Sequence, residues 1–176
     1  GYPLFDEQCR KYQKEQKKQK RILFISQGTI GAYLSELAVE TAQLYPDYEV
    51  VYKLHPAEYS SWRETYPKLQ QENIRVIDNN EKGIYYYFSK CDIQVGVYST
   101  AIFEGLGFGL ETLIYRVGHY DVMEGLVEAG YAYFIDSAKE IEKHLSDEVK
   151  TEQESVFWKT GALDNMKQEI ETLIKE

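Results

Sequence analysis

Two short polar motifs, each directly after an apolar run, carry the side chains best suited to hold a phosphate. Ser99 and Thr100 follow the run 93–98 and open a helical segment. Unpaired backbone N–H groups and two hydroxyls at a helix start favour an anion. The same hydroxyls could simply cap the helix, and their spacing does not choose between the two roles. Glu104 lies one turn beyond Thr100, so its carboxylate either accepts hydrogen bonds from ribose hydroxyls or faces solvent.

The second motif is Lys53-Leu54-His55-Pro56, at the end of the run 48–54. Strand alternation places Lys53 and His55 on the same side. A histidine can donate a hydrogen bond to a phosphate and adds positive charge when protonated, whereas the alternative is a ring paired with a loop carbonyl. Gln27 and Gly28 open a loop after the first apolar run, where glycine would let backbone approach a ligand.

Other histidines and glycines are assigned lesser roles. The glycines at 105, 107 and 109 lie within or at the end of a helix, so we expect them to pack against a neighbouring strand. His119 could line the same crevice as the motifs, and His144 is expected on a solvated helix face. Clustered carboxylates, a Walker loop and a nucleophile elbow are all missing from the sequence, so neither a metal site nor those chemistries are indicated.

Length and composition indicate one globular domain. The chain has 176 residues, of which 43% are hydrophobic and 28% charged, and no apolar run approaches the roughly 18 residues of a membrane-spanning helix. A net charge of −9 makes nucleic acid an unfavourable partner. Cys9 and Cys91 fit no metal or disulfide spacing, which favours a reducing compartment.

Apolar runs alternate with helical segments along most of the chain. Strands are predicted at 21–26, 48–54, 74–77, 93–98, 111–117 and 131–135, and helices at 34–44, 61–71, 82–91, 99–110, 120–129, 137–145 and 161–175, with capping boxes starting at Ser61 and Ser137. This alternation predicts an α/β, doubly wound, Rossmann-like parallel sheet of about six strands with helices on both faces. Ligands of such sheets bind beyond the carboxyl ends of the strands, here between the first and fourth strands, where the polar motifs lie.

The two ends of the chain differ from the middle. Residues 1–21 carry a net charge of +4 and residues 22–176 a net charge of −13. We therefore expect a linker with a basic helix from a missing N-terminal domain over 1–20, a Rossmann-like nucleotide-binding domain over 21–147, and an amphipathic helical tail over 148–176. The basic helix is expected to be solvated, with contact to an anionic membrane or another domain as the alternative.

His55-Pro56 and Ser99-Thr100 together resemble the His-Pro and Ser-Ser/Thr motifs of one enzyme family. They match the carboxyl-terminal, donor-nucleotide-binding domain of GT-B glycosyltransferases, and within it the bacterial capsule and polysaccharide enzymes, including sialyltransferase-like and teichoic-acid polymerase-like members. The segment 96–105 is similar to the family's sequence around its second motif, and the resemblance covers roughly residues 21–145.

The resemblance implies a role for each motif residue. Ser99 and Thr100 would hold the donor's phosphate, and His55 would act as the catalytic residue that offsets charge on the leaving group. Glu104 would bind the ribose. The remaining nucleotide-binding candidates are Lys53, Gln27 and Gly28. The donor would be a nucleotide sugar linked to CMP, CDP or UDP, with cytidine favoured, and neither metal nor cofactor would be needed.

A GT-B enzyme reacts between two domains, so this chain is expected to be catalytically silent alone and to meet its acceptor glycan through the missing domain. The last helix would then leave an apolar face partly exposed. We expect a cytoplasmic location, with the inner membrane face as an extension of it. Two alternatives stay open: half of a nucleotide-sugar 2-epimerase, and a non-catalytic Rossmann-like binding module.

Overall fold

A computed structural model describes residues 3–12, 20–145, 158 and 161–175 of the chain. Its strands are β1 (Arg21–Ile25), β2 (Glu49–Lys53), β3 (Ile74–Ile77), β4 (Ile93–Gly96), β5 (Glu111–Tyr115) and β6 (Tyr133–Ile135). Its α-helices are α1 (Pro3–Lys11), α2 (Gly31–Leu44), α3 (Trp62–Thr65), α4 (Ile84–Phe88), α5 (Ala101–Gly107), α6 (Glu124–Glu128) and α7 (Ala162–Lys175). Short 3-10 helices are η1 (Pro56–Glu58), η2 (Pro67–Leu69), η3 (Tyr120–Met123) and η4 (Ala138–His144).

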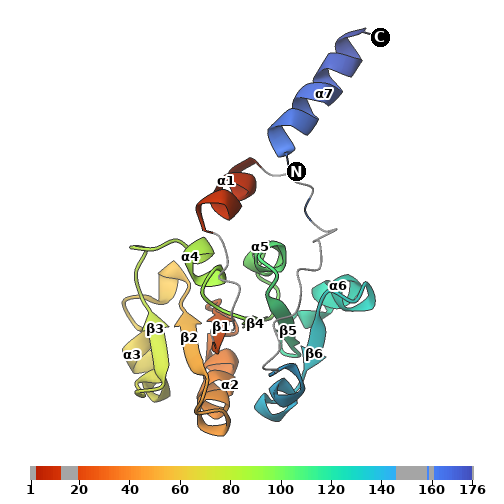
Figure 1. The fold of residues 1–176 in the computed structure, drawn as a ribbon. Coiled ribbons are helices and arrows are strands. Elements are labelled where there is room, and N and C mark those ends of the chain that lie inside the picture. The colour runs from red at the N-terminus through yellow and green to blue at the C-terminus, as the bar shows by residue number, and fades with distance from the viewer. Residues whose placement is uncertain (1–2, 13–19, 146–157, 159–160, 176) are drawn as a thin grey trace.

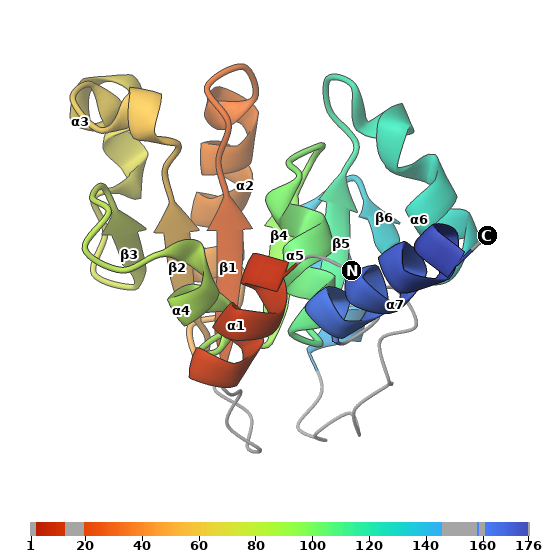
Figure 2. The same cartoon turned by 90° about the horizontal axis from the view of Figure 1, so that it is seen from above.

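The six strands form one parallel sheet in the order β3-β2-β1-β4-β5-β6. The chain first builds outwards from β1 to β3 and then returns to add β4 on the other side of β1. The carboxyl ends of all six strands therefore lie at the same edge of the sheet (Figure 2). The direction in which the chain adds strands reverses between β1 and β4. The predicted fold class is confirmed, including the number of strands and the position of the switch point.

Helices cover both faces of the sheet, as Figure 1 shows. One apolar core lies under α2, α3 and η4, where Leu34 and Ala38 pack with Phe24 of the sheet. The other lies under α1, α4, α5 and α6, where Phe88 and Ile102 are fully buried. Because each strand is covered on both sides, its residues are apolar in succession rather than in alternation.

Several helices differ from their predicted form. The segment 61–71 is divided at Pro67 into α3 and η2, because proline lacks the N–H that would continue the helix. The predicted capping boxes do not form there or at the later site, because neither Ser61 nor Ser137 accepts a backbone N–H with its hydroxyl. At the later site the carboxylate of Glu140 accepts from the backbone N–H of Asp136 instead.

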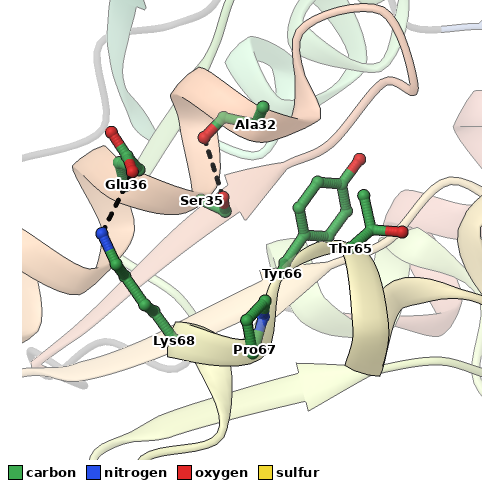
Figure 3. Close-up of a pocket in the computed structure, with 7 residues that line it drawn as sticks. All are labelled: Ala32, Ser35, Glu36, Thr65, Tyr66, Pro67 and Lys68. Atoms are coloured by element: carbon green, nitrogen blue, oxygen red, sulfur yellow. Dashed lines mark hydrogen bonds and ion pairs between the residues drawn. The ribbon is translucent and has the colours of Figure 1, made fainter.

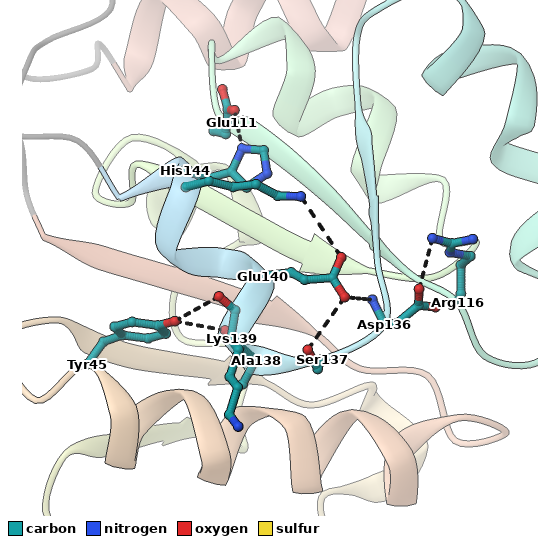
Figure 4. Close-up of polar contacts among 10 residues, drawn as sticks. Tyr45, Glu111, Arg116, Asp136, Ser137, Ala138, Lys139, Glu140 and His144 are labelled. Atoms are coloured by element: carbon teal, nitrogen blue, oxygen red, sulfur yellow. Dashed lines mark hydrogen bonds and ion pairs between the residues drawn. The ribbon is translucent and has the colours of Figure 1, made fainter.

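His144 is buried, so its predicted exposure is wrong. Its Nδ1 lies 2.8 Å from Oε1 of Glu111 on β5, and the ring lies against Tyr133 of β6. On the far side of η4, the hydroxyl of Tyr45 donates to the carbonyl oxygen of Ala138 at 3.1 Å. Figure 4 shows how these contacts anchor η4 to the sheet and to α2. The helical pattern predicted a helix over 137–145 but not which of its faces would be buried.

The two end helices lie on the same side of the molecule (Figure 1). Phe5 of α1 is buried between Phe108 and Trp158, and the carboxylate of Asp6 accepts from the first N–H of α7 at 2.7 Å. The exposed apolar face predicted for the last helix is confirmed, with large side chains 45% to 78% exposed: Leu163, Met166, Ile170, Leu173 and Ile174. Most of the predicted basic helix, residues 13–19, and the predicted boundary at 147 lie outside the described residues.

No helix in the described ranges is both long and apolar enough to cross a membrane.

Gly105 faces a strand, as predicted for the glycine series. The carboxamide of Gln94 on β4 donates to the carbonyl oxygen of Ile102 and to the hydroxyl of Thr112, both at 2.8 Å, and its oxygen fills the space where a Cβ of residue 105 would lie. Gly107 packs instead against Phe5 and Trp158. Gly109 follows the end of α5 with a φ of +68°.

This packing predicts opposite effects for two Gly→Ala changes in helices. Gly105→Ala should lower the free energy of unfolding by about 1–3 kcal/mol, because the methyl group overlaps buried Gln94. Gly125→Ala in α6 should raise it by roughly 0.5–1 kcal/mol, because the site is open and alanine favours the helix. Urea denaturation measures both free energies of unfolding. Equal changes in the two variants would contradict the close contact between Gln94 and residue 105.

Candidate functional site

The candidate site is built from four loops at the carboxyl edge of the sheet. They follow β1, β2, β4 and β5, and they flank the switch point between β1 and β4. Side-chain contacts join each loop to the next.

His55 follows β2 and caps the 3-10 helix η1. Its Nδ1 accepts from the backbone N–H of Ala57 at 3.2 Å, and its own backbone N–H donates to Oε2 of Glu58 at 2.7 Å. Because Nδ1 acts as an acceptor, the neutral ring carries its proton on Nε2. The residue is exposed, so the ring offers an Nε2–H donor at the surface. The ring is thus bonded to a backbone N–H of its own loop and not to a loop carbonyl, and its role towards a phosphate stays a prediction.

Glu58 is buried and joins the β2 loop to the β1 loop. Its Oε1 accepts from the hydroxyls of Ser26 at 3.0 Å and Tyr66 at 2.7 Å. Burial and the bond to this carboxylate raise the pKa of Tyr66, so the phenol keeps its proton as a donor. Ser26 in turn accepts from the hydroxyl of Tyr52 at 3.2 Å. The ends of β1 and β2 are thus fixed to each other by side chains as well as by the sheet.

Lys53 lies at the end of β2 and is buried. Its ammonium donates to the hydroxyl of Tyr59 at 2.5 Å and to the carbonyl oxygens of Leu54 and Asn79 at 3.3 and 3.2 Å. An ammonium has three N–H donors, so these three oxygens use all of them. Lys53 would have to give up one of these bonds to bind a phosphate.

Ser99 and Thr100 lie between β4 and α5, as predicted. The Ser99 oxygen accepts from the backbone N–H of Ala101 at 3.3 Å, which is a local turn and not a cap of α5, whose N-cap residue is Thr100. A hydroxyl that accepts one bond still has its own proton to donate, so this turn and anion binding are compatible. Thr100 is exposed and makes no cap. The structure thus places two hydroxyls beside the switch point.

Tyr98 connects the loops on either side of the switch point. Its hydroxyl and that of Thr29, which follows β1, are 2.5 Å apart. The edge of His119, which follows β5, packs against the Tyr98 ring with centroids 6.1 Å apart. The structure therefore places His119 beside the β4 loop, against the residue that precedes Ser99 and Thr100.

Gln27 and Gly28 lie directly at the end of β1. Among the described residues, Oε1 of Gln27 is one of the buried side-chain atoms that has no hydrogen-bond partner. Gly28 is exposed, and a Cβ built there would meet nothing within 4 Å. The loop thus combines an unused acceptor with open space.

Glu104 lies on α5 and faces α4. Its Oε1 accepts from the hydroxyl of Tyr85 at 3.0 Å. Partial burial raises the pKa of Glu104, an effect that this hydrogen bond opposes. The solvated position that was its alternative is not what the structure has. Its role towards a ribose stays a prediction.

A shallow depression lies apart from these loops, on the outer surface between α2 and the α3–η2 segment. Figure 3 shows its lining, in which Lys68 and Glu36 form an exposed ion pair at 3.2 Å and the Tyr66 ring forms one wall. None of the predicted site residues lines it. We do not assign the ligand site to this depression.

Sequence analysis missed Glu58 and gave Tyr98 no role. Glu58 follows His55 by three residues, which is the capping-box spacing, but that pattern is normally sought with a serine or threonine first. Tyr98 directly precedes Ser99 and was assigned to the end of a strand. Over the described ranges, no three side chains of His, Cys, Asp and Glu come together where they could hold a metal ion.

Comparisons of the sequence found nothing: no protein-family model matches the chain, and no curated protein matches it either. Comparisons of the structure found many similar folds. UDP-GlcNAc 2-epimerase from Methanocaldococcus jannaschii superposes with a TM-score of 0.65 at 12% identity, covering 97% of this chain and 50% of that one. The same enzyme from Neisseria meningitidis gives 0.55 at 20% identity, covering 99% and 48%.

A third similar structure is a single domain. The C-terminal domain of the group 1 glycosyl transferase LpcC from Francisella tularensis gives a TM-score of 0.52 at 18% identity, covering 79% of this chain and 78% of that one. The chain spans about half the length of the two epimerases. It has the Rossmann-like half-fold of GT-B-type glycosyltransferases and nucleotide-sugar epimerases, so the resemblance inferred from the motifs is confirmed at the level of the fold.

The raised pKa of Glu104 predicts a pH-dependent stability difference. Between the ordinary value of 4.5 and the raised value, the folded chain holds a proton that the unfolded chain has released, so wild-type stability falls as pH rises. Glu104→Gln removes this dependence. Its melting temperature relative to wild type should rise from about pH 4 and level off above the raised pKa. A constant difference from pH 4 to 7 would contradict the burial of this carboxylate.

Proposed function

We propose that this chain is the donor-nucleotide-binding half of a two-domain glycosyltransferase in cell-surface polysaccharide biosynthesis. Its ligand is the pyrimidine nucleotide part of a nucleotide sugar, linked to CMP, CDP or UDP. Ser99 and Thr100 bind the phosphate, with Gln27 and Gly28 beside it, and Glu104 binds the ribose. The single observation that carries the proposal is the set of loops joined by side-chain contacts at the switch point, which brings the two motifs to one edge.

The chemistry of transfer supports this use of the edge. Breaking a bond between a sugar and a nucleotide leaves negative charge on a phosphate, and donors fixed in advance stabilise that charge as it develops. The Nε2–H of His55, the hydroxyls of Ser99 and Thr100 and the backbone at Gly28 are such donors. The acceptor glycan and its base belong to a second domain, so we propose that the chain alone binds nucleotide without transferring a sugar.

The alternative of a nucleotide-sugar 2-epimerase half is favoured by a specific observation. The archaeal epimerase gives a TM-score of 0.65 over 97% of this chain, above the value for the glycosyl transferase domain. A structure of that epimerase is described in complex with UDP-GlcNAc and UDP. This favours a uridine donor, whereas the motif resemblance favours cytidine. A non-catalytic binding module is the third candidate.

Nucleotide binding separates the first two candidates from the third. A panel of CMP, CDP, UMP, UDP, GDP and NAD is tested by thermal shift, where a ligand at a hundred times its dissociation constant adds about 2.7 kcal/mol. We expect one pyrimidine nucleotide to stabilise the wild type. Ser99→Ala and His55→Ala should each weaken that binding by about 1–3 kcal/mol, because each removes a hydrogen-bond partner of a charged group.

Thr172→Ala on the exposed surface of α7 is the matched control for loss of a hydroxyl, and it should leave binding unchanged. A non-catalytic module predicts that Ser99→Ala and His55→Ala also leave ligand binding unchanged. Stabilisation by NAD in place of a pyrimidine nucleotide would overturn the proposal.

Product analysis on a two-domain protein containing this chain separates transferase from epimerase. The transferase releases nucleotide and lengthens an acceptor glycan, so we expect free CMP, CDP or UDP in proportion to sugar transferred. The 2-epimerase inverts the configuration at carbon 2 of the sugar, and it needs no acceptor. A nucleotide sugar epimerised at carbon 2 and formed without acceptor would therefore replace the transferase proposal with the epimerase.

A further inference from the structure

Glu58 is a carboxylate buried to 6% exposure among three donors, at the centre of the candidate site. Its two oxygens accept from the backbone N–H of His55 at 2.7 Å, the hydroxyl of Ser26 at 3.0 Å and the hydroxyl of Tyr66 at 2.7 Å. Burying a carboxylate is costly unless hydrogen bonds replace its water, and here they come from three separate segments. A group held in this way fixes the positions of the segments that hold it.

The first segment it fixes is the His55 turn. Glu58 accepts from the backbone of His55, while the ring of His55 accepts from the backbone of Ala57 at 3.2 Å, so the two side chains close one reciprocal turn. The closed turn keeps the Ala57 N–H aimed at Nδ1. The proton of the neutral ring is thereby kept on Nε2, the only ring nitrogen left to donate to a ligand.

The second segment is the loop after β1. Ser26 at the start of that loop donates to Glu58, so the carboxylate holds the His55 turn against the end of β1. Gly31 of α2 packs closely against this carboxylate and its Tyr66 partner. A Cβ at Gly31 would overlap the Tyr66 hydroxyl and lie 2.6 Å from Oε1 of Glu58.

We propose that Glu58 is a positioning residue for phosphate recognition: it fixes the tautomer of His55 and sets the His55 turn against the β1 loop. The inference rests on the proposed function, because it gives the ring its task of donating to the phosphate of a nucleotide. Glu58 itself touches no ligand and acts through His55.

The first test measures the tautomer of the His55 ring without any ligand. At about pH 8.5, two units above the ordinary pKa of imidazole, the ¹⁵N shifts of His55 report which nitrogen carries the proton. Wild type should show it on Nε2. Glu58→Ala should bring the two shifts together as both tautomers become populated, whereas Glu58→Gln, which keeps an oxygen for the His55 N–H, should retain the wild-type pattern. Unchanged shifts in Glu58→Ala would overturn the proposal.

The second test measures binding of nucleotide and of nucleoside by calorimetry, with CDP against cytidine and UDP against uridine. Glu58→Ala should weaken the diphosphate about tenfold, the effect of one hydrogen bond to a charged group, and leave the nucleoside unchanged. Combining it with His55→Ala should weaken binding no further than His55→Ala alone, because both act through one ring. Additive losses would show that Glu58 acts otherwise and would overturn the proposal.

Controls separate the failures. Glu64→Ala removes an exposed carboxylate on α3 and should change neither readout. If Glu58→Ala does not fold, Glu58→Asp replaces it, because the shorter side chain keeps the charge and withdraws from the His55 N–H. A wild type that binds no nucleotide overturns the proposed function and the phosphate role of Glu58 together. A wild type that binds, with Glu58→Ala binding equally well, overturns only the inference.

Discussion

The carboxyl edge of this sheet depends on one buried carboxylate, Glu58, which is bonded to the ends of β1 and β2 and to the turn after α3. A sheet aligns its strands but leaves the loops beyond them free to diverge. Here the loops are joined by hydrogen bonds inside the protein, where such bonds are strong and an unmade one is costly. The same bonds hold His55 at the edge where a ligand of a doubly wound sheet would lie.

The second half of the edge is joined by a different device. Tyr98 reaches from the β4 loop to Thr29 beyond β1 and carries His119 against its ring. This contact crosses the switch point itself, between β1 and β4. Side-chain contacts thus hold both halves of the candidate site in place, and the proposed stabilisation of a developing phosphate charge would require such preorganisation.

The two end helices, α1 and α7, lie together and leave an apolar face exposed. Phe5 and Trp158 stack beneath α5, and Asp6 caps α7, so α1 and α7 meet on one side of the sheet. The face of α7 that carries Leu163, Ile170 and Leu173 is left exposed. An apolar face of this kind is typical of a surface that another protein segment covers.

The sequence alone determined the sheet, its winding and the two motifs, because a strand covered on both faces needs an unbroken apolar run and a parallel sheet needs a helix between strands. It also predicted that Ser99 and His55 would lie at one edge. It could not determine what those side chains contact. Glu58 lies 32 residues from Ser26 along the chain, and His144 lies 33 residues from Glu111, so no local pattern records either pair. The burial of Glu58 and His144, the three hydrogen bonds of the Lys53 ammonium and the bond that Nδ1 of His55 accepts became visible in the fold alone, because burial and hydrogen-bond partners are set by the segments that fold over a residue.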